Sequence, residues 1–244
     1  MMEQVRVTTP KRSEEVPASQ SVPGVVDTEP LTSADRSDSA LHRASRLYLV
    51  LKLLFDFVMS LVGIIFLLPV FLIIALCIKL DDGGPILHFR EIIGQHGRRF
   101  FALKFRTMIP DADAYLAQHS DLMRKYQQNM KLKHDPRITR VGKFLRKTSL
   151  DELPQLFNVF VGQMSLVGPR IIHPSELPRY GEYAPKRLAV KPGITGLWQI
   201  SGRQHISYDE RVRLDMHYID TRTFAFDLAI LVKTLRVFIV HTGA

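Results

Sequence analysis

Two adjacent carboxylates, Asp151 and Glu152, lie where residues capable of chemistry are densest in the 244-residue sequence. One carboxylate of such a pair can attack phosphorus as a covalent nucleophile, while its neighbour holds a divalent metal ion that neutralises phosphate oxygens. Magnesium suits this arrangement because it takes oxygen ligands and is commonly held by one or two carboxylates together with substrate phosphates. The pair is therefore a candidate site for phosphoryl transfer.

Cations that could clamp a diphosphate flank the pair in the sequence. The planar guanidinium of arginine binds phosphate oxygens through two parallel hydrogen bonds. For any one of these cations, a solvated or lipid-facing charge is an equal alternative. The group comprises Arg137, Arg140, Lys143, Arg146, Lys147 and Arg170.

A purely structural role is the alternative for the two carboxylates. Ser149 and Glu152 have the spacing of a capping box, in which Ser149 would be the N-cap of a helix. In that register Pro154 would lie inside the helix, where its missing N–H and its ring are unfavourable. A helix that begins at Asp151 would instead place Pro154 in the first turn, where no N–H partner is needed. The proline weakens the capping-box interpretation without removing it.

The overall charge indicates an anionic partner. The chain carries 33 Lys and Arg against 24 Asp and Glu, a net charge of +9 with a pI near 9.8, which suits nucleic acid, lipid headgroups or a phosphorylated substrate. A single cysteine, Cys77, excludes an intramolecular disulfide and any multi-cysteine metal site. Phosphate-loop, dinucleotide-binding, nucleophile-elbow and zinc-protease motifs are all absent from the sequence.

The charge is unevenly distributed along the chain. Residues 1–42 hold four basic and seven acidic residues, a net charge of −3, so the remaining 202 residues carry +12. This first stretch is rich in Ser, Thr, Pro and Val and has no aromatic residue. Such a composition buries too little surface to offset the entropy of ordering. We predict a disordered tail over residues 1–42.

An uncharged run of 22 residues, from Phe57 to Ile78, follows the tail and is long enough to cross a bilayer core. Pro69 interrupts the run and predicts a kink or a break near Leu68. Basic residues on both flanks favour a re-entrant hairpin by the positive-inside rule, but a proline-kinked spanning helix is an equal alternative from the residues alone. A buried core helix is the weaker alternative.

Beyond Leu80 the pattern indicates a folded domain, which we place at residues 81–244. Short strands are expected at residues 86–89 and 100–105, separated by a turn at residues 94–97. Helices are expected at residues 111–133 and 137–146, the second with Val141, Phe144 and Leu145 on one apolar face. Residues 226–240 predict an apolar helix that lies in the core or in the membrane interface.

Five motifs, in order along the chain, resemble one family closely. They are Lys104-Phe-Arg-Thr-Met108; residues 135–159, which begin Asp-Pro-Arg-Ile-Thr and contain Leu-Asp-Glu-Leu-Pro; Gly162 to Arg170, which ends Val-Gly-Pro-Arg; Lys191 to Arg203, which begins Lys-Pro-Gly-Ile-Thr-Gly; and Asp215-x-x-Tyr218-Ile-Asp220. These segments are similar to the bacterial sugar transferases, the monotopic phosphoglycosyl transferases that start exopolysaccharide, capsule, O-antigen or glycan assembly. The resemblance covers residues 46–240.

The resemblance implies a reaction and roles for particular residues. A sugar 1-phosphate would move from a nucleotide (UDP) sugar to undecaprenyl phosphate with release of UMP, through a covalent phosphosugar intermediate on Asp151. Glu152 would be catalytic as the Mg²⁺ ligand, and Mg²⁺ would be the cofactor. Arg146 and Arg170 match the phosphate-contacting arginines of the family, while Lys104 and Arg106 are further substrate-binding candidates.

The resemblance also implies a fold and a location. The expected fold is α+β and mostly helical: a re-entrant, helix-break-helix membrane hairpin at residues 43–80, followed by a small cytoplasmic catalytic domain with an interfacial C-terminal helix. The expected site is the cytoplasmic face of the bacterial inner membrane. The chain resembles the minimal catalytic form, without the extra membrane region of longer relatives. Two departures stand out, Leu68-Pro69 in place of a Ser-Pro pair and Ile92 where the family usually has a cation.

Two rival functions and two open questions remain at this stage. A membrane-tethered nucleic-acid binder is disfavoured because the cations stand beside carboxylates rather than among stacking aromatics, so no nucleic-acid partner is expected. A non-catalytic membrane scaffold would require Asp151 and Glu152 to be dispensable. The sugar leans weakly towards galactose or glucose, on the resemblance of residues 82–85 to exopolysaccharide hexose transferases. A homo-oligomer is left open.

Overall fold

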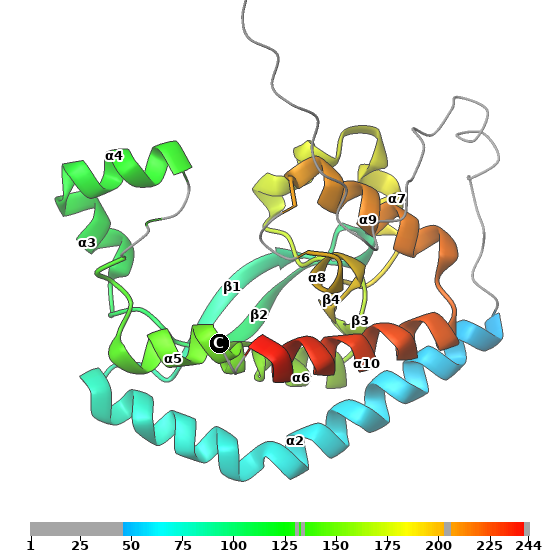
Figure 1. Ribbon diagram of the computed structural model, residues 1–244, viewed down its shortest axis with the longest axis horizontal. Coiled ribbons are helices and arrows are strands. Elements are labelled where there is room, and N and C mark those ends of the chain that lie inside the picture. The colour runs from blue at the N-terminus through cyan, green and yellow to red at the C-terminus, as the bar shows by residue number, and fades with distance from the viewer. Residues whose placement is uncertain (1–45, 130–131, 133–134, 203–205, 242–244) are drawn as a thin grey trace, which may run out of the picture.

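The computed structural model describes residues 46–129, 132, 135–202 and 206–241 (Figure 1). The predicted disordered tail lies outside the described residues. The described part is mostly helical and contains two small two-stranded sheets, so the expected α+β class with a helical majority is confirmed at that level. The division at residue 81 stays a prediction.

Helix α2, Arg46–Asp82, is the longest element at 37 residues and contains the whole apolar run. Among the described residues, α2 is the one helix that is both long enough and apolar enough to cross a membrane. Only 17% of its most apolar 18-residue stretch is buried. The predicted break at Pro69 does not appear as an interruption, because the helix continues through the proline. Figure 1 shows instead that α2 bends near its middle, as expected where proline removes one hydrogen bond and crowds the preceding turn.

The N-terminal arm of α2 is fastened to the rest of the protein by buried polar contacts. Asp227 of helix α10 (Phe224–His241) accepts hydrogen bonds from Tyr48 Oη at 3.0 Å and from Lys52 Nζ at 2.7 Å. Further along the arm, the carboxylate of Asp56 accepts a hydrogen bond from the backbone N–H of Leu166 at 3.0 Å. The first three turns of α2 are therefore held against α10 and the segment that contains Leu166.

The C-terminal arm of α2 is fastened to the same part of the chain by apolar packing and one ion pair. Phe71, Ile74 and Ile78 form a buried cluster with Phe105 and Leu145. At the helix end, Asp82 pairs with the guanidinium of Arg106, whose Nη1 lies 2.6 Å from a carboxylate oxygen. Both ends of the bent helix thus contact one folded body, as Figure 1 shows.

A β-hairpin follows α2. Strands β1 (Leu87–Ile93) and β2 (Arg99–Phe105) pair antiparallel, with Leu87 opposite Phe105, around the 3₁₀ turn η1 (Gln95–Gly97). The predicted hairpin is confirmed, and both strands are longer than predicted. Asn158 of helix α6 (Gln155–Phe160) accepts from the N–H of Leu103 at 2.9 Å and donates to the carbonyl of Phe101 at 2.8 Å. This side chain fixes α6 on the strand that carries Lys104.

In the described residues, three α-helices and the short 3₁₀ helix η2 (Leu150–Glu152) lie between the hairpin and α6. The predicted helix over residues 111–133 is two helices, α3 (Ala112–Gln118) and α4 (Ser120–Asn129), which Figure 1 shows set to one side of the body. The break falls at His119, whose backbone is non-helical. Helix α5, Arg140–Thr148, begins three residues later than predicted, with Thr139 as its N-cap. Leu145 is buried as predicted, but Phe144 is exposed and does not belong to the buried face.

The remaining elements build a second sheet and its core. Strands β3 (Ser165–Val167) and β4 (Gly193–Thr195) pair parallel, and a Cβ atom on Gly193 would collide with the backbone of Gly168, so this approach requires glycine. Around them pack η3 (Pro174–Tyr183), α7 (Ala184–Leu188), α8 (Leu197–Ile200), α9 (Tyr208–Thr221) and α10. Their shared core includes Val167, Ile172, Tyr180, Met216 and Ile230. The predicted C-terminal helix is confirmed as α10.

Candidate active site

The chain turns sharply just before the two carboxylates. Ser149 caps the C-terminal end of α5 in the left-handed conformation, with a φ of 54°, and its N–H donates to the last carbonyls of that helix. Asp151 and Glu152 follow in the single 3₁₀ turn η2, Leu150–Glu152, and α6 begins only after Pro154. Ser149 makes no side-chain capping bond, so the capping-box interpretation was wrong. Glu152 is therefore not part of a capping box.

Lys104 of β2 lies against both carboxylates. Its Nζ is 2.5 Å from Oε1 of Glu152 and 4.0 Å from Oδ2 of Asp151. The side chain of Asp151 is 14% exposed, whereas that of Glu152 is 37% exposed. Burial raises the pKa of Asp151 above its ordinary value, and the negative charge of Glu152 raises it further, while Lys104 lowers it. Asp151 is a half-enclosed carboxylate with Lys104 as its nearest cation and, in the described residues, no side chain hydrogen-bonded to it.

Arg146 and Arg170 approach the same cavity from two different elements. Arg146, in the last turn of α5, donates from Nε to Thr107 Oγ1 at 2.8 Å. Partial burial lowers the pKa of its guanidinium, and the charge of Asp151 opposes that shift. Arg170 follows β3; its Nη1 donates to Glu176 at 3.0 Å, and its guanidinium lies 5.6 Å from the ring centroid of Trp198.

Arg106 and Arg137 line the cavity, but other carboxylates already bind their guanidinium groups. Arg106 is buried and pairs with Asp82, and it also donates to the carbonyls of Pro85 and Met108. Arg137 pairs with Asp135 through two hydrogen bonds of 2.8 Å. Their positions suit stabilising the cavity wall. The other cations that flank the pair in sequence, Arg140, Lys143 and Lys147, are exposed and do not line the cavity.

One cavity of about 1470 Å³ brings the site residues together. All six predicted site residues, Lys104, Arg106, Arg146, Asp151, Glu152 and Arg170, line it, although Asp82 already binds the guanidinium of Arg106. Its volume exceeds that of a typical small-molecule site. The arrangement brings two carboxylates into one cavity with cations of the kind that bind phosphate oxygens.

The donor set allows a magnesium ion only together with substrate. Among the described residues no group of three or more His, Cys, Asp or Glu side chains could hold a metal ion by itself. Asp151 and Glu152 are two adjacent carboxylates at one edge of the cavity, and Mg²⁺ is commonly held by one or two carboxylates plus substrate phosphates. The residues therefore fit Mg²⁺ bound jointly by Glu152 and a diphosphate.

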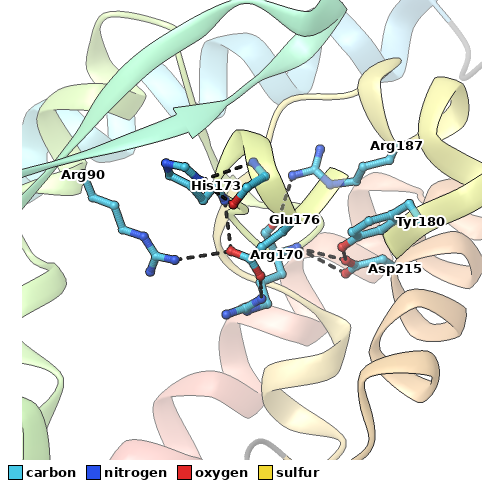
Figure 2. Close-up of polar contacts among 8 residues, drawn as sticks. Arg90, Arg170, His173, Glu176, Tyr180, Arg187 and Asp215 are labelled. Carbon is cyan, nitrogen blue, oxygen red and sulfur yellow. Dashed lines mark hydrogen bonds and ion pairs between the residues drawn. The ribbon is translucent and has the colours of Figure 1, made fainter. Parts of the chain in front are cut away.

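A network behind Arg170 was missed from the sequence (Figure 2). Glu176 accepts from Arg170, from Arg90 at 3.3 Å and from the N–H of His173 at 3.0 Å, and it closes a capping box at the start of η3. Three polar contacts on one carboxylate hold Arg170 towards the cavity. The His173-Pro-x-Glu176 spacing before a 3₁₀ segment was the available sequence signal.

Behind it, Asp215 of α9 fixes the backbone of the same turn (Figure 2). Its carboxylate accepts from the N–H of Arg170 at 3.2 Å and from Tyr180 Oη at 2.8 Å. Arg187 is fully buried and donates from Nη2 to the carbonyl of Arg170 at 2.6 Å. Burial raises the pKa of Asp215 to about 6. The turn that carries Arg170 is thus held from both sides by buried charge.

The departure at Ile92 has a structural explanation. Ile92 is fully buried in the hairpin and does not line the cavity. Two residues earlier, Arg90 lines the cavity and pairs with Glu176. A cation of β1 therefore does contribute to the site, although not at the expected position.

Comparison with known proteins agrees with this geometry. A profile of the family described as "Bacterial sugar transferase" matches residues 47–241. The chain belongs to the bacterial sugar transferases. The match includes α2, the hairpin and every element that lines the cavity.

Three relatives show the range of the similarity. The chain is 46% identical to the undecaprenyl-phosphate galactose phosphotransferase of Salmonella typhimurium, over 80% of this chain and 41% of the relative. It is 43% identical to the exopolysaccharide production protein ExoY of Sinorhizobium fredii, over 74% of this chain and 82% of the relative. It is 38% identical to the undecaprenyl-phosphate glucose phosphotransferase of Komagataeibacter xylinus, over 76% of this chain and 35% of the relative. The chain thus spans about two fifths of its longer relatives and most of ExoY.

Proposed function

We propose that the protein transfers a sugar 1-phosphate from a UDP-sugar to undecaprenyl phosphate and releases UMP, as the first membrane step of exopolysaccharide or glycan assembly. Two of its relatives are named as undecaprenyl-phosphate sugar phosphotransferases. The observation that carries the proposal is Asp151. It is a half-enclosed carboxylate in a large cavity, adjacent to a second carboxylate, and Lys104, Arg146 and Arg170 line the same cavity.

In the first half-reaction, a carboxylate oxygen of Asp151 attacks the phosphorus that carries the sugar. A bond forms between Asp151 and that phosphorus, and the bond from the phosphorus to the bridging oxygen of the diphosphate breaks. The electron pair leaves with UMP. The enclosed position of Asp151 favours attack because a poorly hydrated carboxylate is a better nucleophile once it is ionised.

In the second half-reaction, an oxygen of undecaprenyl phosphate attacks the same phosphorus and displaces Asp151. The carboxylate is regenerated, and the product is the sugar diphosphate lipid. Two displacements at one residue predict ping-pong kinetics. The cavity has room for either phosphate substrate next to Asp151.

The cations have separable roles in this scheme. Lys104, which pairs with Glu152 and lies 4.0 Å from Asp151, lowers the pKa of Asp151 and keeps Glu152 in place. Arg146 and Arg170 reach the cavity from α5 and from the turn after β3, where they bind phosphate oxygens of the donor. Mg²⁺, bound by Glu152 together with the diphosphate, would neutralise charge that develops on the leaving UMP.

The same chain supplies a surface for the membrane, which we infer is the inner membrane approached from its cytoplasmic face. Both arms of α2 are fastened to one body, through Asp227 and Asp56 at one end and Asp82 at the other. This supports a re-entrant helix, because a straight span would carry its two ends to opposite faces. Exposed apolar side chains are found on α2 and also on α5, on α6 and the residue that follows it, and on α10, including Phe144, Phe157, Val161, Leu228, Val232 and Leu235. These helices are expected to lie in the interface.

Topology is tested by cysteine labelling in intact cells. With the exposed native Cys77 replaced by serine, Leu47→Cys and Gly83→Cys introduce one thiol near each end of α2. A membrane-impermeant maleimide should label neither thiol in intact spheroplasts and both after lysis. Labelling of one position alone in intact spheroplasts would show a true span.

Activity is tested by offering purified protein undecaprenyl phosphate, Mg²⁺ and a panel of UDP-sugars and measuring UMP. We expect lipid-dependent UMP release with one or two hexoses, galactose or glucose first. Asp209→Asn changes an exposed carboxylate of α9. It is the matched control for Asp151→Asn and should retain activity. Absence of UMP release with every sugar, or release of UDP in its place, would contradict the proposal.

A further inference from the structure

Two charged side chains of α2 bind the backbone of strand β3. Lys52 Nζ donates to the carbonyl of Val167 at 2.9 Å, and a carboxylate oxygen of Asp56 accepts from the N–H of Leu166 at 3.0 Å. Lys52 and Asp56 are four residues apart, so they lie on the same face of the helix. Asp56 is buried, and the side chain of Lys52 is 17% exposed. The N-terminal arm of α2 therefore holds two consecutive residues of β3.

The ammonium group that holds Val167 is itself fixed by a buried carboxylate. Asp227 accepts from Lys52 Nζ at 2.7 Å and from Tyr218 Oη at 2.7 Å. Tyr218 Oη also lies 3.2 Å from the carbonyl oxygen of Val167. Hydrogen bonds between charged groups are short and directional, so the position of this carbonyl is determined by several partners at once.

The backbone from Val167 to Arg170 has little freedom to move independently. Only Gly168 and Pro169 separate the two residues. The N–H of Gly168 donates to a carbonyl of β4 at 2.9 Å, and the carbonyl of Pro169 accepts from an N–H of β4 at the same distance. Close-packed interiors transmit displacements instead of absorbing them. A shift of Val167 would therefore reach Arg170, which lines the cavity.

Anchoring the helix would not by itself require these charges. The C-terminal arm of α2 is held mainly by the apolar packing of Phe71, Ile74 and Ile78. Apolar packing is non-directional, whereas a hydrogen bond constrains the distance and angle between particular atoms. The polar contacts of the N-terminal arm therefore suit the positioning of β3 better than simple retention of the helix.

We propose that Lys52 and Asp56 are positioning residues for Arg170, so that the donor site is complete only while the N-terminal arm of α2 lies against β3. The inference rests on the proposed function, in which Arg170 binds phosphate oxygens of the donor. Neither Lys52 nor Asp56 is among the described residues that line the cavity, so both act through the strand. The apolar helix thus sets the affinity for the UDP-sugar in addition to binding the membrane.

The test follows the labelling of Asp151 by a labelled UDP-sugar without lipid, because this isolates the first half-reaction. Lys52→Met keeps the apolar part of the side chain and removes the ammonium group. The UDP-sugar concentration that gives half the maximal labelling rate should rise at least about tenfold, equivalent to about 1.4 kcal/mol, while the maximal rate changes less. Arg46→Met removes an exposed cation of the same arm and should match the wild type.

A double-mutant cycle shows whether Lys52 acts through Arg170. In an Arg170→Met protein the phosphate contact is already absent, and Asp151 is intact, so label still accumulates. Adding Lys52→Met should then change the half-maximal concentration by no more than about twofold. The full effect of Lys52→Met in that background would show that Lys52 does not act through Arg170 and would overturn the inference.

Asp56 provides a second test with a conservative variant. Asp56→Asn keeps an oxygen that can accept from Leu166 and should be labelled with nearly the wild-type concentration dependence. Asp56→Ala removes that acceptor and should require more UDP-sugar, as Lys52→Met does. Equal behaviour of the two Asp56 variants would contradict the positioning role. This pair decides the question if thermal unfolding shows that Lys52→Met does not fold.

The outcomes distinguish this inference from the proposed function. If the wild type acquires no label from any UDP-sugar, the proposed function fails. If the wild type is labelled and a folded Lys52→Met protein has the same half-maximal concentration, the function stands and the positioning role is wrong.

Discussion

Asp151 and Asp215 are both enclosed carboxylates close to arginines, yet their surroundings differ. Asp215 lies within the regular helix α9 and accepts hydrogen bonds from Tyr180 and from the backbone of Arg170. Asp151 lies in a 3₁₀ turn after a left-handed residue, faces the cavity, and has Lys104 at 4.0 Å as its nearest cation. One carboxylate has its acceptor capacity filled by the protein, and the other keeps it for a substrate.

The difference shows how burial can serve two purposes. For Asp215, enclosure is compensated by fixed donors, which orient the turn that carries Arg170. For Asp151, enclosure is compensated only in part, by the charges of Lys104 and Arg146, so its oxygens stay available to a ligand in the cavity. A raised pKa alone does not distinguish them, since burial raises it in both. The two carboxylates differ in whether their oxygens remain free to accept hydrogen bonds inside a cavity.

Replacing Asp151 with Asn should have the largest effect. Without a carboxylate nucleophile the covalent step cannot occur, and we expect transfer to fall by at least about 10³-fold. Thermal unfolding of the variant in detergent should match the wild type or lie slightly higher, because an uncompensated charge has been removed. Retained turnover would show that Asp151 is not the nucleophile.

Replacing Lys104 with Met should have the next largest effect. We expect the transfer rate to fall about 10²-fold, which is the loss typical of removing one hydrogen-bond donor that stabilises charge in the transition state. Lys104 lowers the pKa of Asp151, so its removal should move the acid limb of the pH–rate profile to higher pH. Lys147→Met, which removes an exposed cation outside the cavity, is the control and should leave the profile in place. An unshifted acid limb in Lys104→Met would mean that Lys104 does not act on Asp151.

For Asp215 the expected effect is on stability and its pH dependence. Its folded pKa of about 6 lies above the ordinary value of 3.8. The folded protein therefore binds this proton more tightly, and the stabilisation is fully present below about pH 4 and lost as the pH rises through about 6. Asp215→Asn should show a smaller fall in the free energy of unfolding between those pH values, measured by urea denaturation. An unchanged slope would show that Asp215 titrates normally.

Replacing Ser149 with Gly should have the smallest effect. Ser149 adopts a φ of 54° immediately before the carboxylate turn, a conformation that costs a non-glycine residue about 1 kcal/mol. The glycine variant should therefore be more stable by up to about 1 kcal/mol, measured in the same denaturation assay. No comparable residue precedes Asp215 within α9. A loss of stability would show that the Ser149 side chain contributes more than its backbone costs.

Local patterns predicted much of the fold. The apolar run, the turn at residues 94–97 and the apolar C-terminal segment correspond to α2, the β-hairpin and α10. The break between α3 and α4 could not be predicted, because His119 is neither glycine nor proline and no pattern marks it. The capping-box spacing of Ser149 and Glu152 was misleading, because Ser149 ends α5 and precedes η2 without a side-chain capping bond.

The candidate site depended on contacts that are distant in sequence. Lys104 meets Glu152 across 48 positions because β2 and α6 are joined by Asn158, and only the family resemblance pointed to Lys104. Arg106 was predicted from the same motif, but Asp82 binds its guanidinium. Asp215 was noted only as part of a family motif, and the contacts of Glu176 and Asp215 with Arg170 were not predicted, because they depend on how η3 and α9 pack around the turn of Arg170.

The most direct test of the central claim is the mass of the protein after incubation with its UDP-sugar and Mg²⁺ in the absence of lipid acceptor. We predict an added mass equal to one sugar phosphate, located by fragmentation on the peptide that contains Asp151, and its loss when undecaprenyl phosphate is added. A wild-type protein that turns over fully with lipid but never carries this mass, or carries it on another residue, would contradict the account.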